Sequence, residues 1–212
     1  MEPFIKNHQF NLIKHQAALL QKQVHGIIDQ DVETAVRAEA ESKVLSAFDE
    51  LTDEQKSILS DIFFLNTEEE RFEFLKRLSP FRRSFPVLDQ LEVKKLFSYV
   101  KKLKLPVLKE IDFTSVTYLG WKDIGASRHY LIYNLKGKLI GVEGRYVIST
   151  KKGICEICNR YGDVAFMSVS SRKSGAEKNK SFGKYMCYDT KDCNLYIQNP
   201  EKLEAFIQQL IP

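Results

Sequence analysis

The sequence predicts an α+β fold in which an N-terminal antiparallel helical bundle precedes a small antiparallel sheet and a compact four-cysteine module. Helical periodicity dominates residues 1–101, β-branched and aromatic residues dominate residues 113–148, and all four cysteines fall within one 39-residue window. We therefore expect two domains, residues 1–80 and 81–212, with the cysteine module occupying residues 151–212.

The first predicted helix carries an apolar stripe at alternating spacings of three and four residues, the pattern that one helix face requires. The stripe consists of Phe10, Ile13, Ala17, Leu20, Val24 and Ile27. A second helix is predicted over residues 31–48. Helices of this kind with short connections favour an antiparallel bundle.

Two capping boxes predict the starts of the next two helices. Thr52 with Gln55, and Thr67 with Glu70, have the spacing at which side chains satisfy the free amides of a first helical turn. These motifs predict helices over residues 53–64 and 68–78, the second ending at Ser79-Pro80 because the residue before proline avoids the α region. A fifth helix is expected over residues 89–101.

Three segments then favour strands, namely residues 113–121, 128–134 and 138–148. Lys136-Gly137 separates the last two and is typical of a tight hairpin turn. The third strand runs through Gly153 directly into the first cysteine pair. The sheet and the cysteine module are therefore expected to form one C-terminal unit.

The cysteines have metal-ligand spacing. Cys155 and Cys158 form a CxxC knuckle, and Cys187 and Cys193 follow after a hairpin predicted from strands at residues 164–170 and 182–187. Cys193 is expected in a short helix that opens near Thr190. Knuckle, hairpin and helix in this order predict a treble-clef finger that holds one Zn²⁺.

The expected zinc is structural. A hydrolytic zinc keeps a coordination position open for water, whereas four thiolates close the tetrahedron. No histidine follows His129, so a zinc deaminase motif is absent. The sequence therefore favours a binding protein that is not an enzyme and has no small-molecule substrate. The alternative is four ordinary thiols, two of them buried.

Charge and composition limit the choice of partner and compartment. Residues 151–194 hold nine Lys/Arg against five Asp/Glu, whereas residues 1–150 are nearly balanced. No segment has the apolar length of a membrane span, and the N-terminal residues lack a signal-peptide pattern. We expect a cytoplasmic protein that does not associate with a membrane and whose thiols stay reduced.

The chain from about Val116 onward resembles the FusB-type fusidic-acid-resistance proteins. The resemblance rests on short segments around the sheet and the two cysteine pairs: Tyr118-Leu-Gly-Trp121, Ser127-Arg128-His129-Tyr130-Leu-Ile-Tyr133, Gly153-Ile-Cys155-Glu-Ile-Cys158-Asn159, Tyr185-Met-Cys187-Tyr-Asp189 and Cys193-Asn194. It implies an N-terminal helical bundle and a four-cysteine treble clef. It also implies binding of translation elongation factor G and promotion of its release from the ribosome, which protects translation from the drug.

The resemblance further implies a partner surface on the zinc domain. The matching positions are Phe182, Lys184 and Tyr185, with Phe206 on the last helix. Lys180 and Arg172 add positive charge nearby. Phe182 and Tyr185 are three residues apart on a strand and are expected on opposite faces, and Phe206 shares an apolar stripe that also suits core packing. We expect a monomer.

A second hypothesis stays open, that of a zinc-stabilised module that binds ribosomal RNA. The basic residues around the cysteines would neutralise phosphates, and nearby aromatic side chains would stack on bases. The aromatic candidates are Tyr161, Phe166, Phe182 and Tyr185.

Overall fold

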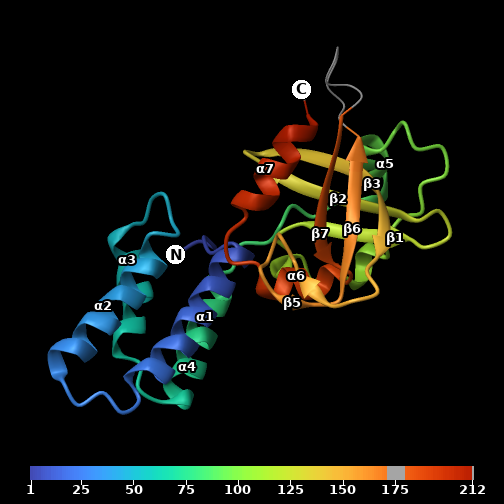
Figure 1. Ribbon diagram of the computed structural model, residues 1–212. Helices are drawn as coiled ribbons and strands as arrows, with labels where there is room; N and C mark the ends of the chain where they lie inside the picture. Colours follow the sequence, from blue (N-terminus) through green and yellow to red (C-terminus); the bar gives the residue numbers. More distant parts are fainter. Residues whose placement is uncertain (171–179, 212) are drawn as a thin grey trace. The chain divides into compact units, whose positions relative to one another are not determined.

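The computed structural model describes residues 1–170 and 180–211 (Figure 1). The chain divides into two compact units, Met1–Arg83 and Ser84–Pro212. The first is helical and the second holds the sheet and the cysteines, so the predicted α+β class is confirmed.

Helices form the N-terminal unit, as the periodicity predicts. They are α1 (Asn7–Val24), α2 (Gln30–Leu45), α3 (Asp53–Ser60) and α4 (Glu68–Leu78). Their apolar faces meet in one core, whose fully buried members include Ile13, Leu20, Val44, Leu59 and Phe74. Burial of these faces supplies most of the stability of helices this short.

Both predicted capping boxes are present. The Gln55 amide donates to Thr52 Oγ1 at 3.2 Å and the Thr52 amide donates to Gln55 Oε1 at 3.0 Å. Thr67 and Glu70 make the same reciprocal pair at 3.1 and 3.2 Å. The starts of α3 and α4 are therefore fixed by local sequence.

The third helix is shorter than predicted, because its α-helical part ends at Ser60 and a 3₁₀ turn spans Asp61–Phe64. The buried Arg37 guanidinium, on α2, donates to the carbonyls of Phe63 at 2.8 Å and Leu65 at 3.0 Å. These carbonyls therefore bond to Arg37 and not to amides of a continuing α-helix. The local sequence does not show this contact, because Arg37 lies on another helix.

The fifth helix is also shorter than predicted, since α5 spans Gln90–Leu96 and not residues 89–101. Phe97 leaves the helical region at φ −121° and ψ 34°. Its ring packs edge-on against Trp121 and Tyr130 at centroid distances of 5.5 and 5.4 Å. Packing of this aromatic cluster replaces the last helical turn.

The C-terminal unit is built on a five-stranded antiparallel sheet of order β1-β2-β3-β6-β7. The strands are β1 (Leu119–Asp123), β2 (Arg128–Leu135), β3 (Lys138–Ile148), β6 (Val164–Ser170) and β7 (Ser181–Cys187). Lys136 and Gly137 turn between β2 and β3 with φ 51° and 85°, which confirms the predicted hairpin. The first strand begins at Leu119, later than predicted, because Phe113–Ser115 form a 3₁₀ turn capped by Asp112.

The two faces of this sheet are covered differently. One face packs against α7 (Glu201–Leu210) and the cysteine module, in a core that includes Leu131, Met167 and Phe206. On the other face, α5 and the segment that follows it cover β1 and β2 around Tyr130 and Ile132. The β6–β7 part of this second face exposes Phe166 and Tyr185. Among the described residues, no helix combines the length and apolarity that a membrane crossing needs.

His8 makes the stability of the N-terminal unit sensitive to acid. Burial and, to a smaller extent, the Lys6 charge lower the pKa of His8 from 6.5 to about 4. The unfolded chain therefore binds a proton more readily, so the contribution of His8 to the free energy of unfolding is fully present above pH 6.5 and falls as the pH drops toward 4.

His8→Gln should remove about 2 kcal/mol of this loss of unfolding free energy in acid, measured by hydrogen exchange of α1 amides at pH 7 and pH 4.5. His15→Gln, an exposed position on the same helix, is the matched control. Equal acid loss in both variants would contradict the assignment.

Candidate metal centre

The first cysteine pair lies in a tight knuckle. Cys155 and Cys158 follow β4 (Gly153–Ile154), which pairs with β5 (Tyr161–Gly162). The Cys155 amide donates to the Arg160 carbonyl at 2.9 Å, and Asn159 adopts a positive φ of 60°. The short ladder and the left-handed residue reverse the chain, so both sulfurs face the same point.

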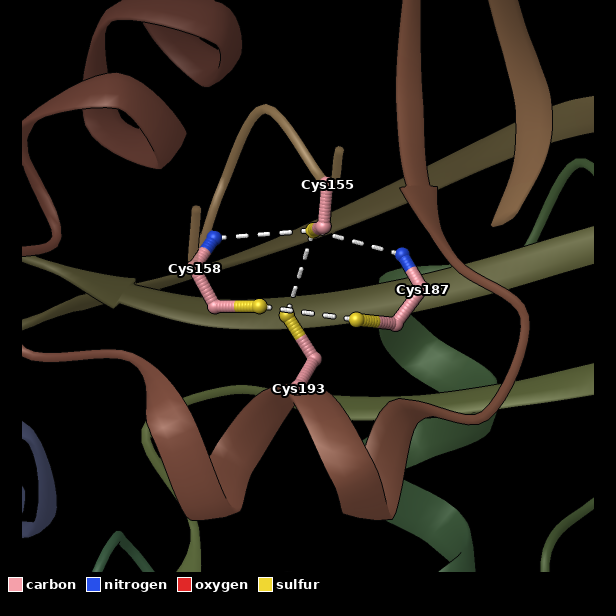
Figure 2. Close-up of side chains that lie close together, drawn as sticks. All are labelled: Cys155, Cys158, Cys187 and Cys193. Atoms are coloured by element: carbon pink, nitrogen blue, oxygen red, sulfur yellow. Dashed lines mark hydrogen bonds between the residues drawn. The ribbon is translucent and has the colours of Figure 1, made fainter. Parts of the chain in front are cut away.

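The second pair comes from a strand end and a helix. Cys187 is the last residue of β7, and Cys193 lies in α6 (Thr190–Tyr196). Asp189 caps α6 by accepting from the Lys191 amide at 2.8 Å. Figure 2 shows the four side chains converging from the knuckle, the strand end and the helix.

The four sulfur atoms lie within 4.8 Å of one another and all four residues are buried. Cys155 and Cys193 sulfurs are 3.9 Å apart, and those of Cys158 and Cys187 are 3.4 Å apart. A disulfide needs about 2.05 Å. A tetrahedron with Zn–S bonds of about 2.3 Å places its sulfurs roughly 3.8 Å apart. The cluster fits one zinc ion, and all four thiols serve as its ligands.

Local donors favour a thiolate at Cys155. The backbone amides of Cys187 and Cys158 donate to its sulfur at 3.3 and 3.5 Å. Hydrogen bonds from the Cys158 thiol, then from Cys187 and Cys193, lower the pKa of Cys155 far below that of an ordinary thiol. Hydrogen bonding to Cys155 raises the pKa of Cys193 instead, because charges cannot accumulate on neighbouring buried sulfurs without a cation. Zinc would supply that cation and hold the knuckle, the end of β7 and α6 together.

The centre is closed to chemistry. Four sulfurs satisfy a tetrahedral zinc and leave no position for a substrate or an activated water. The site is therefore suited to a structural role.

Hydrogen bonds of Asn194 tie α6 to the two residues just before β1. Its side-chain oxygen accepts from the amides of Thr117 at 2.7 Å and Tyr118 at 3.2 Å, and its nitrogen donates to the Tyr118 carbonyl at 2.9 Å. Tyr118 itself is fully buried. Burial raises the pKa of its phenol well above 10, and the Cys193 sulfur adds to this shift. Sheet and metal module thus share one core, as the sequence predicts.

Glu156 fixes the knuckle to strand β7. Its carboxylate accepts from the Tyr185 amide at 2.8 Å and pairs with Lys184 Nζ at 3.0 Å, while its own amide donates to the Tyr185 carbonyl at 2.8 Å. The sequence did not predict a role for Glu156, because its contact with Tyr185 depends on how the knuckle packs against β7. Its place between two ligands in the CxxC motif was the one available signal.

The structure places the residues implied as partner contacts in different settings. Tyr185 is exposed, and Lys184 forms an ion pair with Glu156. Phe182 is on the opposite face of the sheet and packs against the core that includes α7 and the cysteines. Lys180 is exposed next to β7, and Arg172 lies outside the described residues. Phe206 is only 1% exposed. A direct partner contact by Phe206 is incompatible with this burial, since α7 turns its apolar stripe into the core.

Further exposed apolar side chains lie on β4, β5 and β6. Ile154 and Tyr161 pair across β4 and β5, and Phe166 contacts Tyr185 at a ring-centroid distance of 5.1 Å. Their exposed fractions are 62%, 66% and 38%. We call Ile154, Tyr161, Phe166 and Tyr185 the knuckle surface.

Comparison with protein-family models covers both units. The family described as "Elongation factor G-binding protein, N-terminal" matches residues 4–86, and "FBP C-terminal treble-clef zinc-finger" matches residues 93–209. The chain belongs to the elongation factor G-binding protein family. This membership confirms the resemblance and the treble-clef prediction.

A solved member of this group has the same fold throughout. The structure titled "Structure of the fusidic acid resistance protein FusC" matches with a TM-score of 0.79 and 25% sequence identity, over 98% of each chain. The search of curated proteins gave no significant match. The match therefore extends over both the helical unit and the unit that holds the cysteines.

Removal of zinc should unfold the metal module. The free energy of structural zinc binding is about 10–16 kcal/mol, comparable with the whole stability of a domain of this size. Cys193→Ser, or a strong chelator, should therefore abolish hydrogen-exchange protection in β7 and α6. Purified protein should contain one zinc per chain by elemental analysis.

The N-terminal unit provides the internal control for this experiment, because it contains no cysteine. Protection of α1 and α2 should survive chelation. Retention of full protection in β7 without metal would contradict a structural role for zinc.

Proposed function

We propose that this protein binds elongation factor G and promotes its release from the ribosome, as a fusidic-acid-resistance factor or in a related protective role. The observation that carries the proposal is the match of residues 4–86 to the family model named for elongation factor G binding, with residues 93–209 matching the FBP zinc-finger model. The full-length similarity to the fusidic acid resistance protein FusC supports it. The cytoplasm is the proposed site of action, where a reducing environment keeps zinc-binding thiols available.

The knuckle surface is the proposed docking site. Aromatic and large aliphatic side chains dominate the energetics of protein interfaces, and here four of them surround a rigid metal-centred knuckle. The Glu156 hydrogen bonds fix Tyr185 before a partner arrives. Preorganisation of this kind lowers the entropic cost of association.

The other implied contacts take different parts in this proposal. Lys184 supports the knuckle through its ion pair with Glu156, and the exposed Lys180 presents positive charge just before β7. Phe182 and Phe206 act from within, by supporting β7 and α7 in the core. We also propose that the chain acts as a monomer, that the two units correspond to separate domains, and that the zinc finger spans residues 151–212.

Release of the factor requires a difference in affinity. A bound protein shifts a conformational equilibrium only by binding one state more tightly than the other. The proposed mechanism is therefore that the knuckle surface binds preferentially to a conformation of elongation factor G that dissociates from the ribosome. A rigid zinc centre suits this task, because a flexible surface would adapt to both conformations.

Substitutions in the knuckle surface test the docking site. Ile154→Ala and Tyr185→Ala should each weaken binding to purified elongation factor G about tenfold, which is about 1.4 kcal/mol, as measured by calorimetry. Both side chains are exposed, so the zinc content and unfolding temperature should stay near those of the unmodified protein.

Ile124→Ala is the matched control, because Ile124 is also exposed but follows β1 at the opposite edge of the sheet. It should leave the affinity unchanged. Unchanged affinity in all three variants would exclude the knuckle surface, and absence of binding by the unmodified zinc-loaded protein would exclude the proposed function.

A further inference from the structure

A cleft lies on the second face of the sheet, beside the part that α5 covers. Its volume is about 580 Å³. Its lining residues, here called the arginine cleft, are Tyr99, Arg128, Glu143, Gly144, Arg145, Ser168, Ser170 and Ser181. All belong to the C-terminal unit, and nothing in the zinc centre or the knuckle surface accounts for them.

Two guanidinium groups meet in this cleft. Arg128 and Arg145 are direct cross-strand partners on β2 and β3, so their side chains leave the same face of the sheet. Like charges in this register destabilise a sheet unless an anion lies between them. Glu143 is the carboxylate that lines the cleft, and it pairs with Arg128 at 3.5 Å. Arg145 is exposed, so its charge is available to a ligand.

Hydroxyl groups continue the polar lining across the sheet. Ser168 is the β6 partner of Arg145, and Ser170 pairs with Ser181 on β7. Guanidinium and hydroxyl groups are the donors that proteins direct at phosphate oxygens.

The lining excludes an ordinary small-molecule site, which would be mainly apolar with a few placed polar groups. Among the described lining residues, Tyr99 alone carries a large ring. Stacking aromatics lie just outside the cleft instead. Phe166 lies two residues before Ser168 on the same face of β6, and its ring contacts Tyr185. An open antiparallel sheet with charged and aromatic rows side by side is the arrangement on which single-stranded nucleic acid binds.

We infer that the arginine cleft binds the phosphate backbone of single-stranded RNA. The choice of RNA rests on the proposed function, which brings the protein to the ribosome. The cleft itself requires only a polyanion whose phosphates contact Arg145 and the serines. A contact of this kind adds an anchor on RNA to the protein contact at the knuckle surface.

Fluorescence anisotropy with a labelled single-stranded RNA of about 12 nucleotides, across a salt series, tests the inference. Arg145→Gln should weaken binding at least fivefold at 0.1 M salt and lower the slope of log K against log salt by about 0.7, the share of one phosphate contact. Glu143→Gln should strengthen binding about threefold or more, because it removes the carboxylate that competes for Arg128. A gain in affinity cannot result from damage to the fold.

Arg83→Gln is the matched control, since it removes the same charge from an exposed arginine of the other unit. It should change RNA affinity less than twofold. Equal losses for Arg145→Gln and Arg83→Gln, no gain for Glu143→Gln, or no RNA binding by the unmodified protein would each overturn the inference.

Elongation factor G binding by the same variants separates this inference from the proposed function. Arg145→Gln and Glu143→Gln should bind the factor as the unmodified protein does. Loss of factor binding by Arg145→Gln with unchanged RNA affinity would assign the cleft to the protein partner and overturn the RNA site. A single-stranded DNA of the same sequence and length should bind no more tightly than the RNA, and tighter binding of the DNA would overturn the choice of RNA.

Discussion

Convergence of four sulfurs on one point is the constraint from which the C-terminal unit takes its shape. The thiols come from a two-strand knuckle, a strand end and a helix, and the described packing alone brings them within 4.8 Å of one another. Such a cluster needs a cation, because thiolate charges repel in a buried site. Zinc therefore also determines where the exposed Tyr185 lies, because Glu156 in the knuckle accepts a hydrogen bond from the Tyr185 amide.

The sequence was most informative where local chemistry decides the structure. The capping boxes at Thr52 and Thr67, the Lys136-Gly137 turn and the cysteine spacing each depend on residues a few positions apart, and each is confirmed. The predicted ends of α3 and α5 were wrong, because residues distant in the sequence determine where these helices end. Arg37 holds the carbonyls after α3, and the aromatic cluster around Phe97 ends α5.

Partner-facing residues were harder to predict than metal ligands, for a physical reason. A ligand set is defined by residue type and spacing, whereas exposure depends on which face of a strand or helix meets the core. Strand alternation correctly separated Phe182 from Tyr185, but the stripe of α7 left Phe206 open to either role, and the structure buries it. Exposure of Phe166 follows from the β6–β7 register, where its ring lies over Gly183, a position with no side chain to displace it.

The resulting unit presents two different chemistries on a common sheet: an apolar knuckle surface beside the metal and an arginine cleft further along the strands. Both depend on a strand order and register that the zinc centre stabilises at β7. X-ray absorption at the zinc edge of the purified protein tests this account most directly. Four sulfur neighbours at about 2.3 Å are the predicted result. A first shell with nitrogen or oxygen ligands, or fewer than four sulfurs, would contradict it.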